Sequence, residues 1–234
     1  TDADVPRDAI NATVDETFVP VEPRTVPLDE GSFRNVKYWG LRRARERWFG
    51  QLATPVPAAR LAFGDDDTPG TRREAATEPG LVVSGLLLSI HSNGTGTTLA
   101  VVNPGEDAVE LSKRQPPRDT SPRRLIAVYP RGVGPTAWTR RNPPNTVERS
   151  LALLGDTADA GRIRDVAMVL AGQPERVKLV GRGPAGVIAA YAALLVPEKV
   201  SEVLILDPPT SHRDGPHLRG DGERPAWLDV GPRA

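Results

Sequence analysis

The sequence predicts an α/β fold in which a mainly parallel sheet carries helices on both faces. Short, nearly continuous runs of Val, Ile and Leu alternate with helical segments between residues 81 and 206. Such runs are typical of strands that are buried on both faces. Before them, residues 1–34 are rich in Pro, Asp, Glu and Thr and show no sustained period. These observations predict an α/β domain preceded by an extended N-terminal segment.

The first part of the chain, residues 1–79, is predicted to be an extended lead-in with one amphipathic helix. Residues 35–50 combine aromatic and aliphatic side chains with arginines and end at a glycine, which is typical of a helix. Residues 51–79 contain proline and glycine turn signals and three consecutive aspartates. We interpret that stretch as loop, with a short strand at residues 59–63.

The second part, residues 80–212, is predicted to form the α/β domain itself. Strands are expected at residues 81–91, 97–102, 124–129, 177–180 and 200–206, and helices at 146–172 and 185–195. Gly155 and Gly161 are expected to divide the longer helical segment into two helices. Residues 213–234 are polar, so the sheet is expected to end at its last predicted strand. That edge needs a cover, either a neighbouring domain or a second copy of the chain.

The composition excludes several kinds of protein. Lys plus Arg and Asp plus Glu number 30 each, so no net charge favours nucleic acid or membrane partners. The absence of cysteine excludes disulfides, cysteine-ligated zinc and cysteine nucleophiles. No apolar run approaches the roughly 18–20 residues that span a bilayer. The compartment stays open between an exported and a cytoplasmic bacterial protein.

Four stretches resemble the α/β-hydrolase superfamily, in its acetyl-xylan-esterase and prolyl-oligopeptidase-like branch. Residues 129–134 (Tyr-Pro-Arg-Gly-Val-Gly) resemble the strand-end D-x-R-G-x-G of that branch, with Tyr129 in place of its aspartate. The other stretches are residues 142–165, 177–195 and 203–207. The resemblance implies a carboxylic ester hydrolase acting on a polysaccharide or small-molecule ester. It also implies an incomplete, C-terminally truncated fold, because the family's last strands and catalytic histidine lie beyond the position of Asp207.

The turn that should carry the family's nucleophile has the sequence Gly-Arg-Gly-Pro-Ala-Gly, residues 181–186. In the G-x-S-x-G elbow, the serine attacks the substrate and the next N–H helps to bind the oxyanion. Here Gly183 stands at the serine position and Pro184 has no N–H. Loss of one such donor alone costs on the order of 10²–10³ in rate. A serine mechanism at Gly183 is therefore not expected.

The same turn is open to three interpretations. It can be a tight strand-to-helix turn that needs glycine for close packing. It can be a degenerate or altered catalytic turn. It also satisfies the dinucleotide-binding pattern G-x-G-x-x-G, with Asp207 about 20 residues later as the acid that holds a ribose.

An active enzyme would need a rearranged site, and the nearest candidates follow the last predicted strand. Asp207, Ser211 and His212 could supply an orienting acid, a nucleophile and a base. The amides of Asn103 and Gly105 are candidate oxyanion donors. Gly183 and Arg131 are expected to line the same cleft.

The loop after that strand has two further interpretations. His212, Asp214 and His217 place two imidazoles and a carboxylate within six residues, which is a pattern able to bind a divalent metal. The loop can equally be solvated and without function. No other cofactor is predicted.

The first functional prediction is an α/β-hydrolase-type domain that hydrolyses carboxylic esters at a non-standard or degenerate site. The second is a catalytically inactive module with a binding or structural part in a larger hydrolase. The third is a nucleotide- or metal-dependent enzyme that uses the turn at residues 181–186.

Overall fold

The computed structural model describes residues 26–49, 52, 54–113, 123–139, 141 and 143–209. The chain divides into two compact units, Thr1–Gly40 and Leu41–Ala234. Helix α2, Glu30–Trp48, begins earlier than the predicted residue 35. Its start is capped, because the Ser32 N–H donates to Asp29 Oδ1 at 2.7 Å. No helix in the described ranges is long and apolar enough to cross a membrane.

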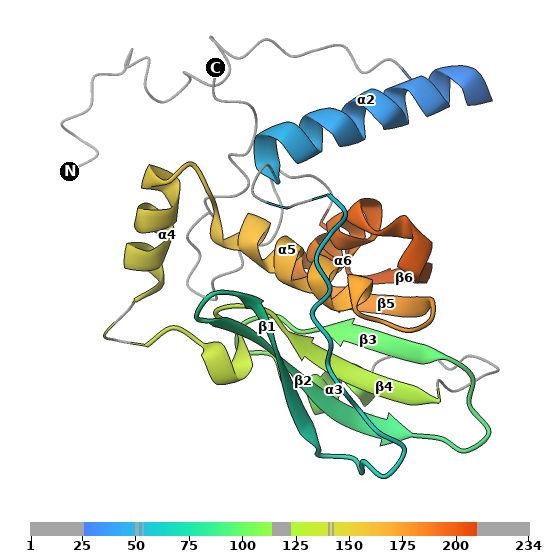
Figure 1. The fold of residues 1–234 in the computed structure, drawn as a ribbon, viewed down its shortest axis with the longest axis vertical. Helices are drawn as coiled ribbons and strands as arrows, with labels where there is room; N and C mark the ends of the chain where they lie inside the picture. The colour runs from blue at the N-terminus through green and yellow to red at the C-terminus, as the bar shows by residue number, and fades with distance from the viewer. Residues whose placement is uncertain are drawn as a thin grey trace. The chain divides into compact units, whose positions relative to one another are not determined.

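A six-stranded mixed sheet has the order β1-β2-β4-β3-β5-β6 (Figure 1). The strands are β1 (Arg72–Glu78), β2 (Leu81–Ile90), β3 (Thr97–Val101), β4 (Arg124–Tyr129), β5 (Val177–Arg182) and β6 (Val200–Leu206). Strand β2 runs antiparallel to both β1 and β4. Strands β4, β3, β5 and β6 are parallel to one another. The predicted mainly parallel sheet is confirmed.

Helices cover both faces of the sheet, as predicted. The helices after α2 are α3 (Ala108–Lys113), α4 (Pro144–Leu153), α5 (Ala158–Ala171) and α6 (Pro184–Leu195). Alternate residues of β4 serve two cores, since successive side chains of a strand point to opposite faces. Ile126 and Val128 join the larger core with α5 and α6. Ala127 and Tyr129 face the other side, where Ala108 of α3 is buried.

Three parts of the fold differ from the sequence-based expectation. Strand β1 lies in a stretch that was predicted to be loop, because its sequence Arg-Arg-Glu-Ala-Ala-Thr-Glu is charged and polar. It is an edge strand, and edges tolerate such residues. The strand predicted at residues 59–63 is wrong: the segment forms no strand and is held where the Ala59 N–H donates to Met168 O at 2.8 Å. Helix α3 was not predicted.

The two glycines expected to divide the long helical segment behave differently. Gly155 lies between α4 and α5 with a φ of +73°, so it ends a helix as predicted. Gly161 lies inside α5, and the prediction that it breaks the helix is wrong. A Cβ at this position would lie 2.8 Å from Arg131 Cδ. Gly161 is therefore needed for close packing and not for a turn. The predicted domain boundaries after residues 79 and 212 stay predictions.

Candidate active site

Three of the predicted site residues lie together at the carboxyl ends of parallel strands. Asn103 follows β3, Gly183 follows β5 and Asp207 follows β6. The Asn103 Nδ2 donates to Arg182 O at 2.9 Å, and the Gly183 N–H donates to Leu206 O at 2.7 Å. Ligands of parallel α/β sheets bind outside the carboxyl ends of the strands. The carboxyl ends of β3, β5 and β6 therefore form the candidate site.

Gly183 has a backbone conformation that a side chain would strain. Its φ is +49° and its ψ is −122°, outside the left-handed helical region, and it joins β5 directly to α6. A sharp, strained strand-to-helix turn is the geometry that exposes the nucleophile in a G-x-S-x-G elbow. The turn has that strand-to-helix form, but its central residue carries no side chain.

The two flanking glycines allow the strand and the helix to approach each other. A Cβ on Gly181 would lie 2.6 Å from the carbonyl carbon and oxygen of Ala185. A Cβ on Gly186 would overlap Ile205 Cγ2 and lie 2.9 Å from Gly181 O. The first and the last glycine of the Gly-Arg-Gly-Pro-Ala-Gly turn are therefore both required sterically. This steric requirement agrees with a tight strand-to-helix turn. A degenerate catalytic turn or a dinucleotide-binding turn would have the same requirement.

The side chain of Asn103 ties the loop after β3 to the turn. Its Oδ1 accepts a hydrogen bond from the Ala185 N–H at 2.9 Å, while its Nδ2 donates to Arg182 O. The amide thus bridges the last residue of β5 and the first turn of α6. Ala185 is the first residue of α6 after the proline, so Asn103 Oδ1 occupies a helix N-terminal donor that an anionic ligand would otherwise use.

Glu106 holds Asn103 in place. Its Oε2 accepts from both the backbone N–H and the Nδ2 of Asn103, each at 3.0 Å. The predicted oxyanion donor, the Asn103 amide, is therefore directed at a carboxylate of its own loop. Gly105, the other predicted donor, lies exposed at the tip of a turn that is closed by the Glu106 N–H on Asn103 O at 3.2 Å. Its φ of +74° suits glycine at that place.

Asp207 lies beside the turn and is engaged by an arginine. Its Oδ2 accepts from Arg182 Nε at 2.7 Å, in an ion pair whose aspartate side chain is 70% exposed. Its φ is +47°, a conformation that Asp adopts more readily than most residues. The dinucleotide interpretation would need this carboxylate for a ribose and the Ala185 N–H for a phosphate. Both groups already have partners within the chain, and so the contacts disfavour it.

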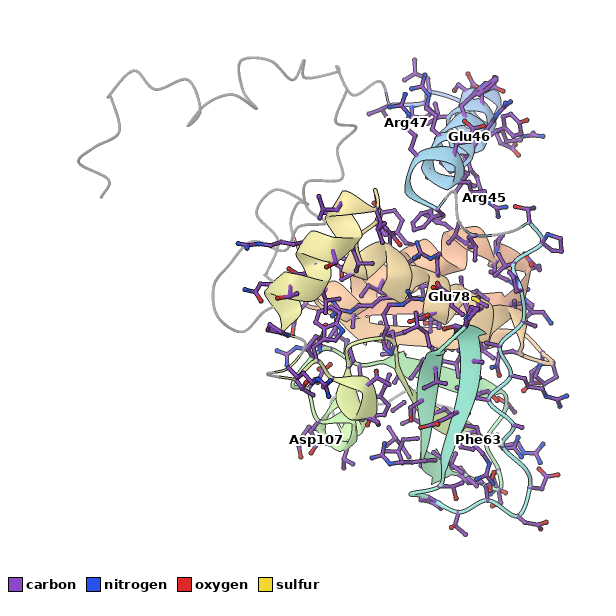
Figure 2. All side chains as sticks on the ribbon, turned by 60° about the vertical axis from the view of Figure 1, so that its left-hand side comes forward. Arg45, Glu46, Arg47, Phe63, Glu78 and Asp107 are labelled. Carbon is purple, nitrogen blue, oxygen red and sulfur yellow. The ribbon has the colours of Figure 1, made fainter. Side chains whose placement is uncertain are left out.

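Arg131 belongs to a buried ion cluster between β1 and α5. Its backbone N–H and Nε donate to Asp165 Oδ2, each at 2.9 Å, and its Nη2 donates to Asp165 Oδ1 at 2.7 Å. The same Nη2 also donates to Glu78 Oε1 at 2.7 Å. Figure 2 labels Glu78, which lies at the end of β1. Arg131 was predicted to line the cleft. In the structure its guanidinium group links α5 to the end of β1.

The opposite charges of Arg131 and Glu78 each favour the ionised form of the other. Burial alone would lower the pKa of Arg131, but hydrogen bonds and charges from Asp165 and Glu78 outweigh it and raise that pKa. The hydrogen bond from Arg131 in turn lowers the pKa of Glu78, against the opposite effect of burial. Arg164 joins the cluster through Asp156 at 2.5 Å and Glu78 at 3.5 Å. Both shifts favour the charged forms of Arg131 and Glu78.

Four predicted site residues lie outside the described residues. They are Ser211, His212, Asp214 and His217. The nucleophile, base and metal-ligand roles assigned to them stay predictions. Within the ranges that the structure describes, no group of three His, Asp or Glu side chains could hold a metal ion.

Sequence patterns did not indicate the roles of Arg182 and Glu106. The signal for Glu106 was present as an Asn-Pro-Gly-Glu turn directly after a buried strand. An Asn followed three residues later by Glu can form a locally hydrogen-bonded turn. No local pattern indicates that the free end of such an Asn reaches a helix 82 positions later.

A comparison with solved structures matches the arrangement of the sheet and its helices. The chain is similar to a crystal structure described as a candidate acetyl xylan esterase of Bacteroides fragilis, with a TM-score of 0.54 and 18% identity. The fold is of the α/β-hydrolase type. The match covers 79% of this chain and 57% of the other, so the chain spans little more than half the length of that hydrolase.

Other matches to α/β hydrolases are weaker. An α/β hydrolase of Novosphingobium aromaticivorans has a TM-score of 0.41 and 16% identity over 59% of this chain and 44% of its own. A serine hydrolase involved in carbazole degradation has a TM-score of 0.36 and 17% identity over 59% and 48%. No protein-family model matches the chain. No curated protein matches it either.

In the α/β-hydrolase fold, the nucleophile elbow is a strand-to-helix turn at the top of the sheet. The turn from β5 through Gly183 to α6 corresponds to it in order and in shape. A second oxyanion donor of that fold comes from the loop after its third strand. In this chain that loop carries Asn103 and Glu106, which bond each other and the turn.

Proposed function

We propose that this hydrolase-type domain is catalytically inactive at its elbow and has a binding or structural part in a larger protein. One observation carries the proposal: the Ala185 N–H at the start of α6 donates a hydrogen bond to Asn103 Oδ1. Pro184 supplies no oxyanion donor, and the next N–H along the chain, that of Ala185, is already bonded to the side chain of Asn103.

The other groups needed for acyl transfer are also missing or engaged. Position 183 has no side chain to attack a carbonyl, and Pro184 has no N–H. The Gly183 N–H donates a hydrogen bond to Leu206 O, and the Asn103 N–H donates one to Glu106 Oε2. Loss of one oxyanion donor costs on the order of 10²–10³ in rate, so loss of the nucleophile together with these donors leaves no serine mechanism at this turn.

For a binding role, we propose the ligand class that the resemblance to hydrolases implies. That class is a carboxylic ester, on a polysaccharide or a small molecule, bound at the carboxyl ends of the parallel strands. The similar structure from Bacteroides fragilis is described as a candidate acetyl xylan esterase, which supports an acylated polysaccharide as the ligand to examine. Retention of the chain on acetylated but not on deacetylated xylan would be the expected result.

Hydrolysis of p-nitrophenyl acetate tests the catalytic part of the proposal. The wild-type chain should give no saturable turnover above buffer, and a fluorophosphonate should label no serine. Gly183→Ser should stay inactive, because the added hydroxyl would still have no oxyanion donors. Saturable wild-type turnover, or a labelled serine, would overturn the proposal.

Ester hydrolysis through a rearranged site is the second candidate. Asp207 favours it, because it lies next to the elbow and Ser211 and His212 follow within five residues. If the wild-type chain is active, Asp207→Asn and His212→Ala should each remove most of the turnover. Asp66→Asn, at an exposed acid in another loop, is the matched control. Turnover that survives both of the first two changes would exclude this site.

A further inference from the structure

The loop that joins β2 to β3 (Figure 1) contains Asn93-Gly94, the one place in the sequence where glycine follows asparagine. Asn93 is exposed, and Gly94 is half-buried. The Gly94 N–H donates to His91 O at 3.1 Å, which makes Asn93 the third residue of a four-residue turn. Asparagine suits such a turn. The carboxamide of Asn93 and the backbone nitrogen of Gly94 are therefore neighbours at an exposed loop tip.

The tip of this loop is held only lightly. Within the ranges that the structure describes, the Asn93 side chain forms no hydrogen bond. The bond from the Gly94 N–H to His91 O lies toward the long end of the usual range for N–H···O bonds. Exposed hydrogen bonds at loop tips open at a low cost in free energy. The side chain of Asn93 and the nitrogen of Gly94 can therefore approach each other without unfolding of the sheet.

An asparagine in such a turn can react with the backbone nitrogen of the residue that follows it. When that nitrogen loses its proton, it attacks the side-chain Cγ, forms a cyclic imide and releases ammonia. Water then opens the imide at either of its carbonyl groups, which leaves aspartate or isoaspartate. Glycine in the second position favours the attack, because it has no Cβ to obstruct the approach.

We infer that Asn93 is a site of spontaneous deamidation, in which Gly94 N displaces ammonia from the Asn93 side chain and water completes the conversion to aspartate and isoaspartate. In the first step a C–N bond forms and another breaks, and the leaving amide takes up the proton that Gly94 N loses. In the second step water breaks a C–N bond of the imide. The chain and water are the only reactants. The inference does not depend on whether the elbow is catalytic.

The structure protects Asn103 from the same reaction. Its Oδ1 accepts from the Ala185 N–H and its Nδ2 donates to Arg182 O, each at 2.9 Å, so both ends of the amide are held. Pro104 follows, and a proline nitrogen has no proton to lose. Attack on the Asn103 side chain is therefore not expected in the folded chain.

Two further asparagines among the described residues are protected by helices. Asn35 lies inside α2, where the next N–H belongs to the helical hydrogen-bond ladder. Asn145 lies in the first turn of α4, and its Oδ1 accepts from the Thr146 N–H at 2.8 Å. That N–H also donates to Pro143 O at 3.0 Å, and the threonine is branched at Cβ. Asn93 thus differs from both in its backbone and in its neighbour.

The reaction changes the turn and leaves the sheet in place. A neutral amide becomes a carboxylate, and isoaspartate adds a methylene group to the main chain. The pairing of β2 and β3 with β4 reaches Ile90 on one side of the turn and Thr97 on the other, and both lie opposite Arg124. The reacting residues lie outside these ladders. The product should therefore be a folded chain that is more acidic than the original.

Peptide mapping by mass spectrometry, after incubation of the folded chain in mildly alkaline buffer, tests the inference. The peptide that contains Asn93 should gain the mass that replacement of an amide by an acid adds. An isoaspartyl methyltransferase should then transfer methyl groups to the incubated chain. The conversion should accelerate as the pH rises, because the attacking nitrogen must lose its proton. The peptides that contain Asn103 and Asn145 should keep their masses.

Two variants and an unfolded sample serve as controls. Asn93→Gln should stay unmodified, because its attack would need a larger and less favourable ring. Gly94→Ala keeps the asparagine but adds a methyl group beside the attacking nitrogen, so conversion should be severalfold slower. Circular dichroism checks that both variants are folded. Asn93 that reacts in guanidinium chloride but not in the folded chain, an unchanged rate in Gly94→Ala, or faster conversion at Asn103 or Asn145 would overturn the inference.

Discussion

At the scale of one residue, Gly183 gives the turn between β5 and α6 its shape without a side chain. A residue with a φ of +49° and a ψ of −122° is strained unless it is glycine. Where a serine occupies such a turn, the strain is balanced by function. In this chain glycine occupies it, which removes the strain together with the hydroxyl. The Asn103 side chain accepts a hydrogen bond from the Ala185 N–H, and this bond stabilises the turn.

Gly186→Ala should destabilise the domain by about 1–3 kcal/mol, the usual cost of inserting a methyl group into a closely packed place. The new Cβ would overlap Ile205 Cγ2 and approach Gly181 O. Urea denaturation measures the change. Gly64→Ala is the control and should change stability by less than about 0.5 kcal/mol, because Gly64 is exposed and the added Cβ would meet its nearest atom, Asp66 N, at 4.0 Å. Equal losses in the two variants would contradict the steric explanation.

At the scale of elements, the ion cluster joins β1 and α5. Asp165 of α5 accepts from Arg131 and also from Thr77 Oγ1 of β1 at 2.9 Å. Arg131 reaches back to Glu78 at the end of β1. An edge strand with few apolar residues is thus tied to the covering helix by charges. Such a cluster stabilises only when it is complete, because a lone buried charge is costly.

Asp165→Asn should destabilise the domain by about 3–5 kcal/mol, because it leaves the buried Arg131 guanidinium without its main carboxylate. The midpoint and slope of urea unfolding give the change. Glu46→Gln is the control: Glu46 pairs with Arg42 at 2.8 Å, and both side chains are more than half exposed. Its loss should cost about 0.5 kcal/mol or less. A similar cost for the two changes would show that the cluster contributes no more than a surface pair.

The start of α5 contains a buried acid whose ionisation depends on folding. Burial raises the pKa of Asp159 to about 7, although the Arg162 guanidinium at 2.8 Å opposes the shift. In the unfolded chain the pKa of an aspartate is about 3.9. Between these two values the folded chain binds more protons than the unfolded chain does. The contribution of Asp159 to stability is therefore complete below about pH 4 and is lost as the pH rises to about 7.

Asp159→Asn should remove this pH dependence, because the amide does not titrate. The difference in unfolding free energy between wild type and variant should shift in favour of the variant as the pH rises from 4 to 7, and should be constant above about pH 8. Urea unfolding at several pH values measures it. Glu148, whose charge also raises the pKa of Asp159, can be changed to Gln as a control for through-space effects. A difference that does not vary with pH would contradict the raised pKa.

At the scale of the whole molecule, the part of the sheet that the structure describes begins with a charged strand and ends with an apolar one. The charged β1 strand ends the sheet on one side, while the apolar β6 strand is the last described strand on the other.

The fold could largely be predicted from the sequence, whereas the candidate site could be predicted only in part. The strands at residues 124–129 and 200–206 were identified with their observed bounds, because buried strands of a parallel sheet consist of continuous apolar runs. Strand β1 was missed, since Arg72 and Glu74 lie on a solvated edge where the apolar signal is absent. The meeting of Asn103, Gly183 and Asp207 was expected because they follow parallel strands.

The sequence by itself determined that the elbow has neither a serine at position 183 nor an N–H at position 184, since these are properties of the residues present. It also determined the alternation of strands and helices, which follows from local apolar patterns. Only the tertiary structure decided that Asn103 accepts the Ala185 N–H and that Arg131 bonds to Asp165. Those contacts join residues 82 and 34 positions apart, and their geometry depends on how the sheet and its helices pack.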